Sequence, residues 1–210
     1  MTRSTPIVVL IVTLLSGCPD PAEDAVAANV EDPSGSSAAP QSTEGLEAVA
    51  FSNEGSSVEW EGSKVTRTHT GRFGTFEGTI YLADSITDSV VSATIETSSI
   101  EADAARLTEH LRTEDFFDVS RFPRATFRSE SIRAGGEGNA THTVRGQLEL
   151  HGHTVSIEFP ATIRIDAQRV RVDAEFVIDR QRFGIVYAGA PDDLIRDGVV
   201  IRLMIDGGRG

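Results

Sequence analysis

From Ser57 to Asp206 the chain alternates apolar and polar residues over one segment after another. A period of two is typical of β-strands that bury one face and expose the other. The segments with this pattern are 57–66, 73–83, 89–100, 124–133, 141–151, 154–166, 169–180 and 197–206. Most are joined by short turns such as "DAQR" at 166–169, and short turns place consecutive strands side by side and antiparallel.

Eight antiparallel strands with one apolar face each predict an all-β fold, an eight-stranded antiparallel barrel. Closure into a barrel removes the exposed sheet edges that invite aggregation. A barrel of this size either fills its interior with side chains or holds one small ligand. The alternation alone leaves both alternatives open.

One segment, "DAARLTEHLRTEDFF" at 103–117, breaks the strand pattern. Asp103 is the predicted N-cap of a helix of two to three turns, and Leu107 and Leu111, four residues apart, mark its apolar face. A tight turn carrying Phe116 and Phe117 follows. An open barrel end needs a cover, so we expect this segment to close one end.

The N-terminus predicts export and anchoring. Arg3 precedes an apolar run at 7–15, which is too short to span a bilayer and is typical of a signal peptide. The "LSGC" that follows resembles the lipobox of bacterial lipoproteins, with Cys18 as the lipid-modified residue. Cys18 is the only cysteine, so a disulfide framework is excluded. We expect residues 1–17 to be a lipoprotein signal peptide.

Residues 18–45 are rich in Ala, Ser, Pro and acidic residues and contain no Lys or Arg. This composition predicts a disordered acidic tether, with a reach of roughly 30 Å if it behaves as a flexible coil. Residues 46–210 are then left for one folded domain with a sizeable core. The net charge of −13 argues against a nucleic-acid partner.

Clusters of polar residues could bind a metal ion or act in catalysis, but for each cluster we favour a structural role. Metal ligands or a catalytic group could be formed by His110, Glu114, Asp115 and Asp118, yet the acidic residues alternate with aromatic residues as caps and turn residues do. His151 and His153 lie in a hairpin turn without a third ligand at convergent spacing. We therefore predict no metal site, no catalytic residue, no cofactor and no enzyme activity.

Four segments resemble the YceI-like family of bacterial envelope proteins. They are "GRFGTFEGTIYL" (71–82), "SSIEADAARLTEHLRTEDFFDVSRFPRATFRS" (98–129), "VRGQLELHGHTVSIEFP" (144–160) and "DRQRFGI" (179–185). The second, with "HLR" followed by "DFFD", is the most diagnostic. The resemblance implies a lipocalin-like barrel with an apolar tunnel that binds a long-chain amphipathic lipid, a polyisoprenoid or an isoprenoid quinone, without catalysis.

On that resemblance, the apolar faces of the strands and of the covering segment become the expected lipid-binding residues. They are Phe76, Ile80, Leu82, Val91, Ile95, Leu111, Phe116, Phe117, Phe127, Leu148, Ile157, Phe159, Val172, Phe176, Ile201 and Leu203. The expected location is the bacterial cell envelope, with a membrane as partner through Cys18. A structural or protein-interaction barrel with a filled core remains the alternative; no protein partner is indicated, and a dimer is left open.

Overall fold

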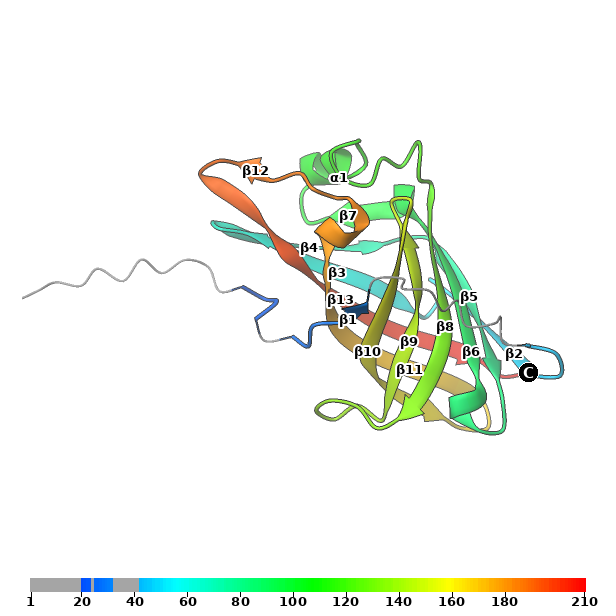
Figure 1. Cartoon of the computed structure of the whole chain (residues 1–210). Coiled ribbons are helices and arrows are strands. Elements are labelled where there is room, and N and C mark those ends of the chain that lie inside the picture. The colour runs from blue at the N-terminus through cyan, green and yellow to red at the C-terminus, as the bar shows by residue number, and fades with distance from the viewer. Residues whose placement is uncertain (1–19, 24, 32–41) are drawn as a thin grey trace, which may run out of the picture.

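The structure, a computed structural model, describes residues 20–23, 25–31 and 42–210. The predicted signal peptide (1–17) and lipid anchor Cys18 lie outside the described residues. Antiparallel strands curl into a barrel, and a short helix lies at the end drawn uppermost in Figure 1. The predicted all-β barrel with a short helical segment at one end is confirmed.

The strands and helices alternate with short turns along the described chain. The strands are β1 (Asn29–Glu31), β2 (Glu47–Ser52), β3 (Ser57–Lys64), β4 (Arg67–Phe73), β5 (Phe76–Leu82), β6 (Val90–Glu96), β7 (Ile100–Ala102), β8 (Arg124–Ala134), β9 (His142–Leu150), β10 (His153–Ile165), β11 (Arg169–Asp179), β12 (Gly189–Ala190) and β13 (Asp193–Gly208). The α-helix is α1 (Ala105–Leu111), and the 3₁₀ helices are η1 (Ile86–Asp88), η2 (Thr97–Ser99) and η3 (Arg180–Phe183).

Most of these strands combine into eight staves of the barrel. A stave is here either one strand or two strands that continue each other along the barrel wall. β4 passes directly into β5, and β6 into β7, while β2 and β3 run antiparallel to the β4–β5 line. β2 with β3, β4 with β5 and β6 with β7 thus make three staves, and β8, β9, β10, β11 and β13 make five more. β13 pairs with β3, which closes the ring. Closure protects the backbone groups of edge strands from other chains.

The observed strands follow the predicted segments closely but differ in number. β1, β2, β4 and β12 were not predicted as strands, and the predicted strand 89–100 is divided by η2 into β6 and β7. β4, "RTHTGRF", contains Phe73 as its one large apolar residue. Its strand conformation follows from backbone pairing with β3 and β7, which an apolar pattern does not reveal.

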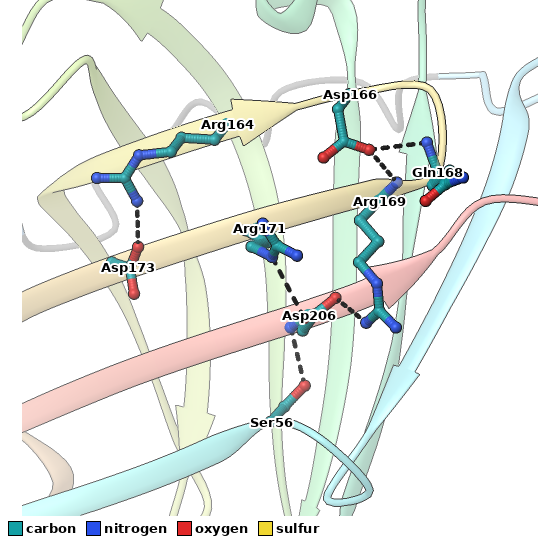
Figure 2. A network of polar contacts seen from close by, with 8 residues as sticks. All are labelled: Ser56, Arg164, Asp166, Gln168, Arg169, Arg171, Asp173 and Asp206. Atoms are coloured by element: carbon teal, nitrogen blue, oxygen red, sulfur yellow. Dashed lines mark hydrogen bonds and ion pairs between the residues drawn. The ribbon is translucent and has the colours of Figure 1, made fainter.

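The outer face of the barrel is polar, as the alternation predicts. Arg169 and Arg171 on β11 both donate to the carboxylate of Asp206 on β13, at 2.8 and 3.4 Å (Figure 2). Val170 and Val172, which alternate with these arginines, face the interior. Solvent-exposed ion pairs of this kind add little stability, so the fold depends mainly on the inward face.

The predicted helix is present, but it begins differently from the prediction. Ala104, and not Asp103, is the N-cap of α1. The Asp103 carboxylate instead accepts a hydrogen bond from Nδ1 of His69 at 2.8 Å. The local sequence predicts that Asp103 caps the helix, but its side chain is instead hydrogen-bonded to His69 of the distant strand β4.

Part of the predicted disordered tether packs into the barrel wall. β10 and β11 pair only between Thr162–Ile165 and Val170–Asp173, so they separate toward the end that carries α1. Residues 26–31, hereafter the strap, lie between them. β1 pairs antiparallel with residues 156–158 of β10. On the other side, the amide of Ala28 donates to the carbonyl of Val177, and the amide of Val177 donates to Val26, each at 2.8 Å.

The strap supplies hydrogen bonds that the separated strands do not make with each other. An unpaired buried peptide group costs about 1–3 kcal/mol. Detaching the strap would leave such groups on β10 and β11, so these hydrogen bonds hold the strap in place. Ala28 is only 6% exposed and belongs to the main apolar core. In this stretch the structure differs from the disordered tether expected over 18–45.

Candidate ligand cavity

The barrel holds an apolar cavity of about 500 Å³. Residues from all eight staves line it, together with α1 and the turn that follows. The predicted residues that line the cavity are Phe76, Ile80, Val91, Ile95, Leu111, Phe116, Phe117, Phe127, Leu148, Ile157, Phe159, Val172, Phe176, Ile201 and Leu203. The alternation of the strands therefore brings widely separated apolar residues to one surface.

Leu82 is the predicted residue that does not line the cavity. It is buried at the end of β5, in a second apolar cluster that includes Val49 and Val170. Those two valines are almost completely inaccessible. They close the barrel at the end opposite α1, so Leu82 has the inward orientation of its strand but lies beyond the floor of the cavity.

The lining shows that the interior is hollow. Val91, Leu148, Val172 and Ile201 face the cavity, yet each is only partly buried. In a filled core such side chains would touch neighbours on all sides, as protein interiors are packed nearly as densely as organic crystals. Their residual accessible surface belongs to the cavity. The alternative of a filled barrel, left open by the sequence, is not what the structure contains.

Aromatic side chains shape the middle of the cavity. Phe159 on β10 and Phe176 on β11 stack with ring centroids 4.2 Å apart, across the seam where these two strands are not paired with each other. Trp60 on β3 lies against Gly71 of β4, where a Cβ atom would come within 2.5 Å of its ring. Trp60 lines the cavity but was not among the predicted lining residues, although its alternation with Val58 was visible.

The segment after β7 covers the upper end of the cavity. Leu107 and Leu111 of α1 and Phe116 and Phe117 of the next turn all line it, which confirms the predicted apolar face. Phe117 makes an edge-on contact with Phe73 at 5.8 Å between centroids. This lid is therefore held by the same apolar surface that it covers.

We expect Phe117→Asp to destabilise the protein by about 2 kcal/mol or more, because it places a carboxylate among apolar lid residues. His110→Ala is the matched control in the same segment. His110 also lines the cavity and meets Phe116 edge-on, but it is partly exposed and its Nε2 is 2.8 Å from the exposed Asp115. Its loss buries no charge and should change stability by less than about 1 kcal/mol. Urea unfolding of both variants measures the difference. Equal losses would show that the lid does not depend on its apolar face.

The cavity opens beside β12 and the start of β13. Among the lining residues only Tyr187 and Ala190 are exposed, so the mouth lies beside these two residues. The β12–β13 hairpin, to which Ala190 belongs, protrudes next to α1 in Figure 1. Lys64 at the end of β3 forms an ion pair with Asp193, which also accepts hydrogen bonds from Thr66. The hydrogen bond from Lys64 is the main cause that lowers the pKa of Asp193 below its ordinary 3.8.

Asp20 makes a second ion pair at the mouth, 2.7 Å from Nη1 of Arg196. Burial acts to raise the pKa of Asp20, but the hydrogen bonds from Arg196 and the amide of Ala22 outweigh it, and the pKa is lowered. A carboxylate with a lowered folded-state pKa stabilises the fold above its unfolded pKa and loses that contribution as the pH falls through the folded value. Both pairs should therefore hold the mouth at neutral pH and weaken only in acid.

A buried arginine is hydrogen-bonded to two of the segments near the mouth. Arg180, in η3, is 6% exposed. Its guanidinium donates to the carbonyls of Ile185 (2.7 Å), Ile195 (3.2 Å) and Arg196 (3.1 Å). The register of β13 against β3 shifts between Ile195 and Val199. The carbonyls of Ile195 and Arg196 therefore lie where the regular hydrogen bonding between the two strands is interrupted. The sequence offered only the R-x-x-F-G resemblance as a signal for this role.

The acidic and histidine clusters are engaged in local contacts. Nδ1 of His151 is 3.0 Å from the carbonyl of Phe183, and Asp118 accepts a hydrogen bond from Ser120. Over the described ranges, no three His, Cys, Asp or Glu side chains converge as metal ligands do. Nor does any helix in the described part of the chain have the length and apolarity needed to cross a membrane.

A closed antiparallel barrel with an apolar interior and a helical lid defines a lipocalin-like barrel. The family assignment agrees with that class. Residues 50–206 match the YceI-like domain, and the chain belongs to the YceI-like family.

Known proteins resemble the chain in sequence and in fold. A UPF0312 protein of Vibrio parahaemolyticus is 36% identical over 92 residues, which cover 43% of this chain and 48% of that protein. The chain thus spans about half the length of the curated relatives it matches. Burkholderia cenocepacia BcnA superposes with a TM-score of 0.66 at 21% identity, covering 74% of this chain and 98% of BcnA.

A second solved structure is a polyisoprenoid binding domain from Saccharophagus degradans implicated in plant cell wall breakdown. It superposes with a TM-score of 0.62 at 17% identity, covering 79% of this chain and 99% of that domain. At these identities both likenesses establish the shared barrel fold.

Proposed function

We propose that the protein binds the apolar tail of a long-chain amphipathic lipid, of the polyisoprenoid or isoprenoid quinone class, inside the barrel. The observation that carries the proposal is the cavity of about 500 Å³ with its apolar lining. This volume falls within the range of about 300–1,000 Å³ that is usual for small-molecule sites. The likeness to a polyisoprenoid binding domain supports the choice of ligand class.

The physical chemistry of the cavity suits a prenyl tail. Such a tail has no polar group to satisfy and needs continuous apolar walls that exclude water. At about 25 cal/mol per Å², burying roughly 300 Å² of tail contributes on the order of 7 kcal/mol before the costs of ordering. The ion pairs Lys64–Asp193 and Asp20–Arg196 place polar groups only at the mouth, where a headgroup would lie.

The proposed role is binding, sequestration or transport, without a chemical step. The histidines at 110 and 151 are hydrogen-bonded to nearby groups and do not form a nucleophile–base pair with a serine in the described contacts. The proposed location is the bacterial cell envelope, because "LSGC" at 15–18 resembles a lipobox. Acylation of Cys18 would then attach the barrel to a membrane.

Lipid extraction followed by mass spectrometry tests the proposal. We expect a long-chain prenyl species to co-purify with the full chain, and a lipid-free sample to take up a fluorescent prenyl analogue. Leu148→Trp combined with Ile201→Trp fills the cavity and should lower retention of the analogue by about tenfold or more, without lowering the melting temperature. Both residues line the cavity from opposite parts of the barrel wall.

Met204→Trp is the matched control for the cavity-filling pair. Met204 lies on β13 like Ile201, but it is exposed on the outside of the barrel. This variant should retain the analogue as the parent protein does. If the filled cavity retains the analogue equally well, the lipid is bound elsewhere and the proposal is wrong.

A further inference from the structure

The exposed apolar side chains of the protein gather at the cavity mouth. Among the described residues five large apolar side chains are exposed, and four of them are Val65 (46%), Val186 (64%), Tyr187 (37%) and Leu194 (49%). These four are hereafter the collar. Single exposed apolar residues are ordinary, but a concentration of them beside a binding cavity marks an interaction surface.

The collar residues come from three segments that are bonded together. The amide of Val65, in the β3–β4 turn, donates to the carbonyl of Leu194 at 3.2 Å. The amide of Ile195 donates to the carbonyl of Ala188 at 2.9 Å, which joins β13 to the loop carrying Val186 and Tyr187. The collar is therefore part of one bonded unit, to which the β3–β4 turn, the loop before β12 and the start of β13 contribute. The β12 end of this unit protrudes beside α1 in Figure 1.

The charged groups beside the collar carry both signs, and Arg67 and Asp192 are exposed. Lys64, next to Val65, is paired with Asp193, next to Leu194. The net charge of −13 gives no general attraction to anionic lipid headgroups. An apolar surface of this kind fits a phosphatidylcholine-like interface, where Tyr and aliphatic side chains enter the headgroup boundary.

The N-terminus approaches the barrel at this same mouth. Asp20 contacts Arg196 at 2.7 Å and Ser63 at 3.4 Å, and these partners lie two residues from Leu194 and Val65 respectively. Cys18 is two residues before Asp20, so chain geometry keeps their Cα atoms within roughly 7 Å. The contacts of Asp20 thus keep the proposed acylation site close to the collar. A long tether does not separate the two.

We infer that the collar docks on a lipid bilayer, with the cavity mouth facing the membrane surface. This inference rests on the anchoring proposed above. In this orientation a prenyl tail passes between bilayer and cavity without crossing water. The apolar floor near Leu82 lies at the far end of the barrel, away from the membrane.

Site-specific fluorescence on the lipidated full chain in phosphatidylcholine vesicles tests the orientation. The sulfur of Cys18 carries the lipid through a thioether in this form, so one introduced cysteine is the only free thiol. Val186→Cys carries an environment-sensitive fluorophore on the collar, and Ala167→Cys carries it in the exposed turn between β10 and β11. We expect spin-labelled lipids to quench the label at 186 about threefold more strongly than the label at 167. Equal quenching, or stronger quenching at 167, overturns the inference.

Two further measurements test whether the collar itself contacts the lipid. Adding Val65→Glu and Leu194→Glu to the Val186→Cys chain should bring its quenching to the level at 167, and undiminished quenching would overturn the role of the collar. A spectral shift that grows with protein concentration without vesicles would show that a second copy covers the collar, which also overturns docking on lipid. If Cys18 proves unmodified, the Cys18→Ser chain with the same labels tests the collar alone on the same vesicles.

Failure of docking and failure of lipid binding are distinguishable in the same samples. Retention of the prenyl analogue is measured on each labelled protein by extraction. A chain that docks but retains no analogue contradicts the proposed function and leaves docking intact. A chain that retains the analogue while its label at 186 stays in water overturns docking alone.

Discussion

Replacing Arg180 with methionine is expected to lower the free energy of unfolding by about 3 kcal/mol or more. Methionine fills similar space but cannot donate to the carbonyls of Ile185, Ile195 and Arg196. Those acceptors lie in the loop after η3 and at the irregular register of β13, where no ladder partner replaces the guanidinium. Urea unfolding measures the loss.

The consequence should be concentrated at the mouth. We expect protease cleavage within residues 185–197 to become faster in Arg180→Met before the rest of the barrel is attacked. Arg106→Met, on the exposed side of α1, is the matched control and should change stability by less than about 0.5 kcal/mol. Arg180→Lys keeps the charge without the planar fork and should fall between the two. If Arg180→Met is as stable as Arg106→Met, the hydrogen bonds at η3 do not hold the mouth.

The second large effect is expected from Ala28→Asp in the strap. Ala28 is buried in the main core, and an unpaired carboxylate there costs several kcal/mol unless the segment leaves the wall. Because the strap is held by a few backbone bonds, we expect it to detach. Loss of those bonds should lower the free energy of unfolding by about 2 kcal/mol.

Detachment has a local signature that hydrogen exchange can detect. The amide of Val177 donates to Val26 in the intact wall, so its exchange should accelerate in Ala28→Asp. The seam beside Phe159 and Phe176 would then be open, and a bound prenyl analogue should dissociate faster. Ala27→Asp, one residue away and exposed, is the control. Equal exchange at Val177 in both variants would count against the strap as part of the wall.

The class of fold was predictable because it follows from a local pattern. An alternation of apolar and polar residues assigns each side chain to one face of a strand, whatever its neighbours are. Fifteen of the sixteen predicted residues consequently line one cavity, including Phe76, Phe127 and Phe176, which are far apart in the sequence. Leu82 was included for the same reason, and nothing local indicates where along β5 the cavity ends.

Other features escaped prediction because they depend on contacts between distant segments. β4 is a strand because β3 and β7 offer hydrogen bonds to it, and Asp103 does not cap α1 because His69 holds its carboxylate. Residues 26–31 lie within the stretch 18–45, whose composition is typical of disorder, yet a gap between β10 and β11 gives them partners. A sequence pattern describes what a segment favours alone, whereas these outcomes depend on which groups elsewhere lack a partner.

By itself, the sequence determined eight of the strand segments, their inward faces and the apolar side of the lid, since each is set by residues adjacent along the chain. Only the tertiary structure decided that the barrel is hollow, that Arg180 supports the mouth and that the N-terminal segment completes the wall. The reason is physical. A cavity is the volume left when all staves have packed together, and the buried guanidinium of Arg180 is stable because three carbonyls from two segments and the carboxylate of Asp197 accept its hydrogen bonds.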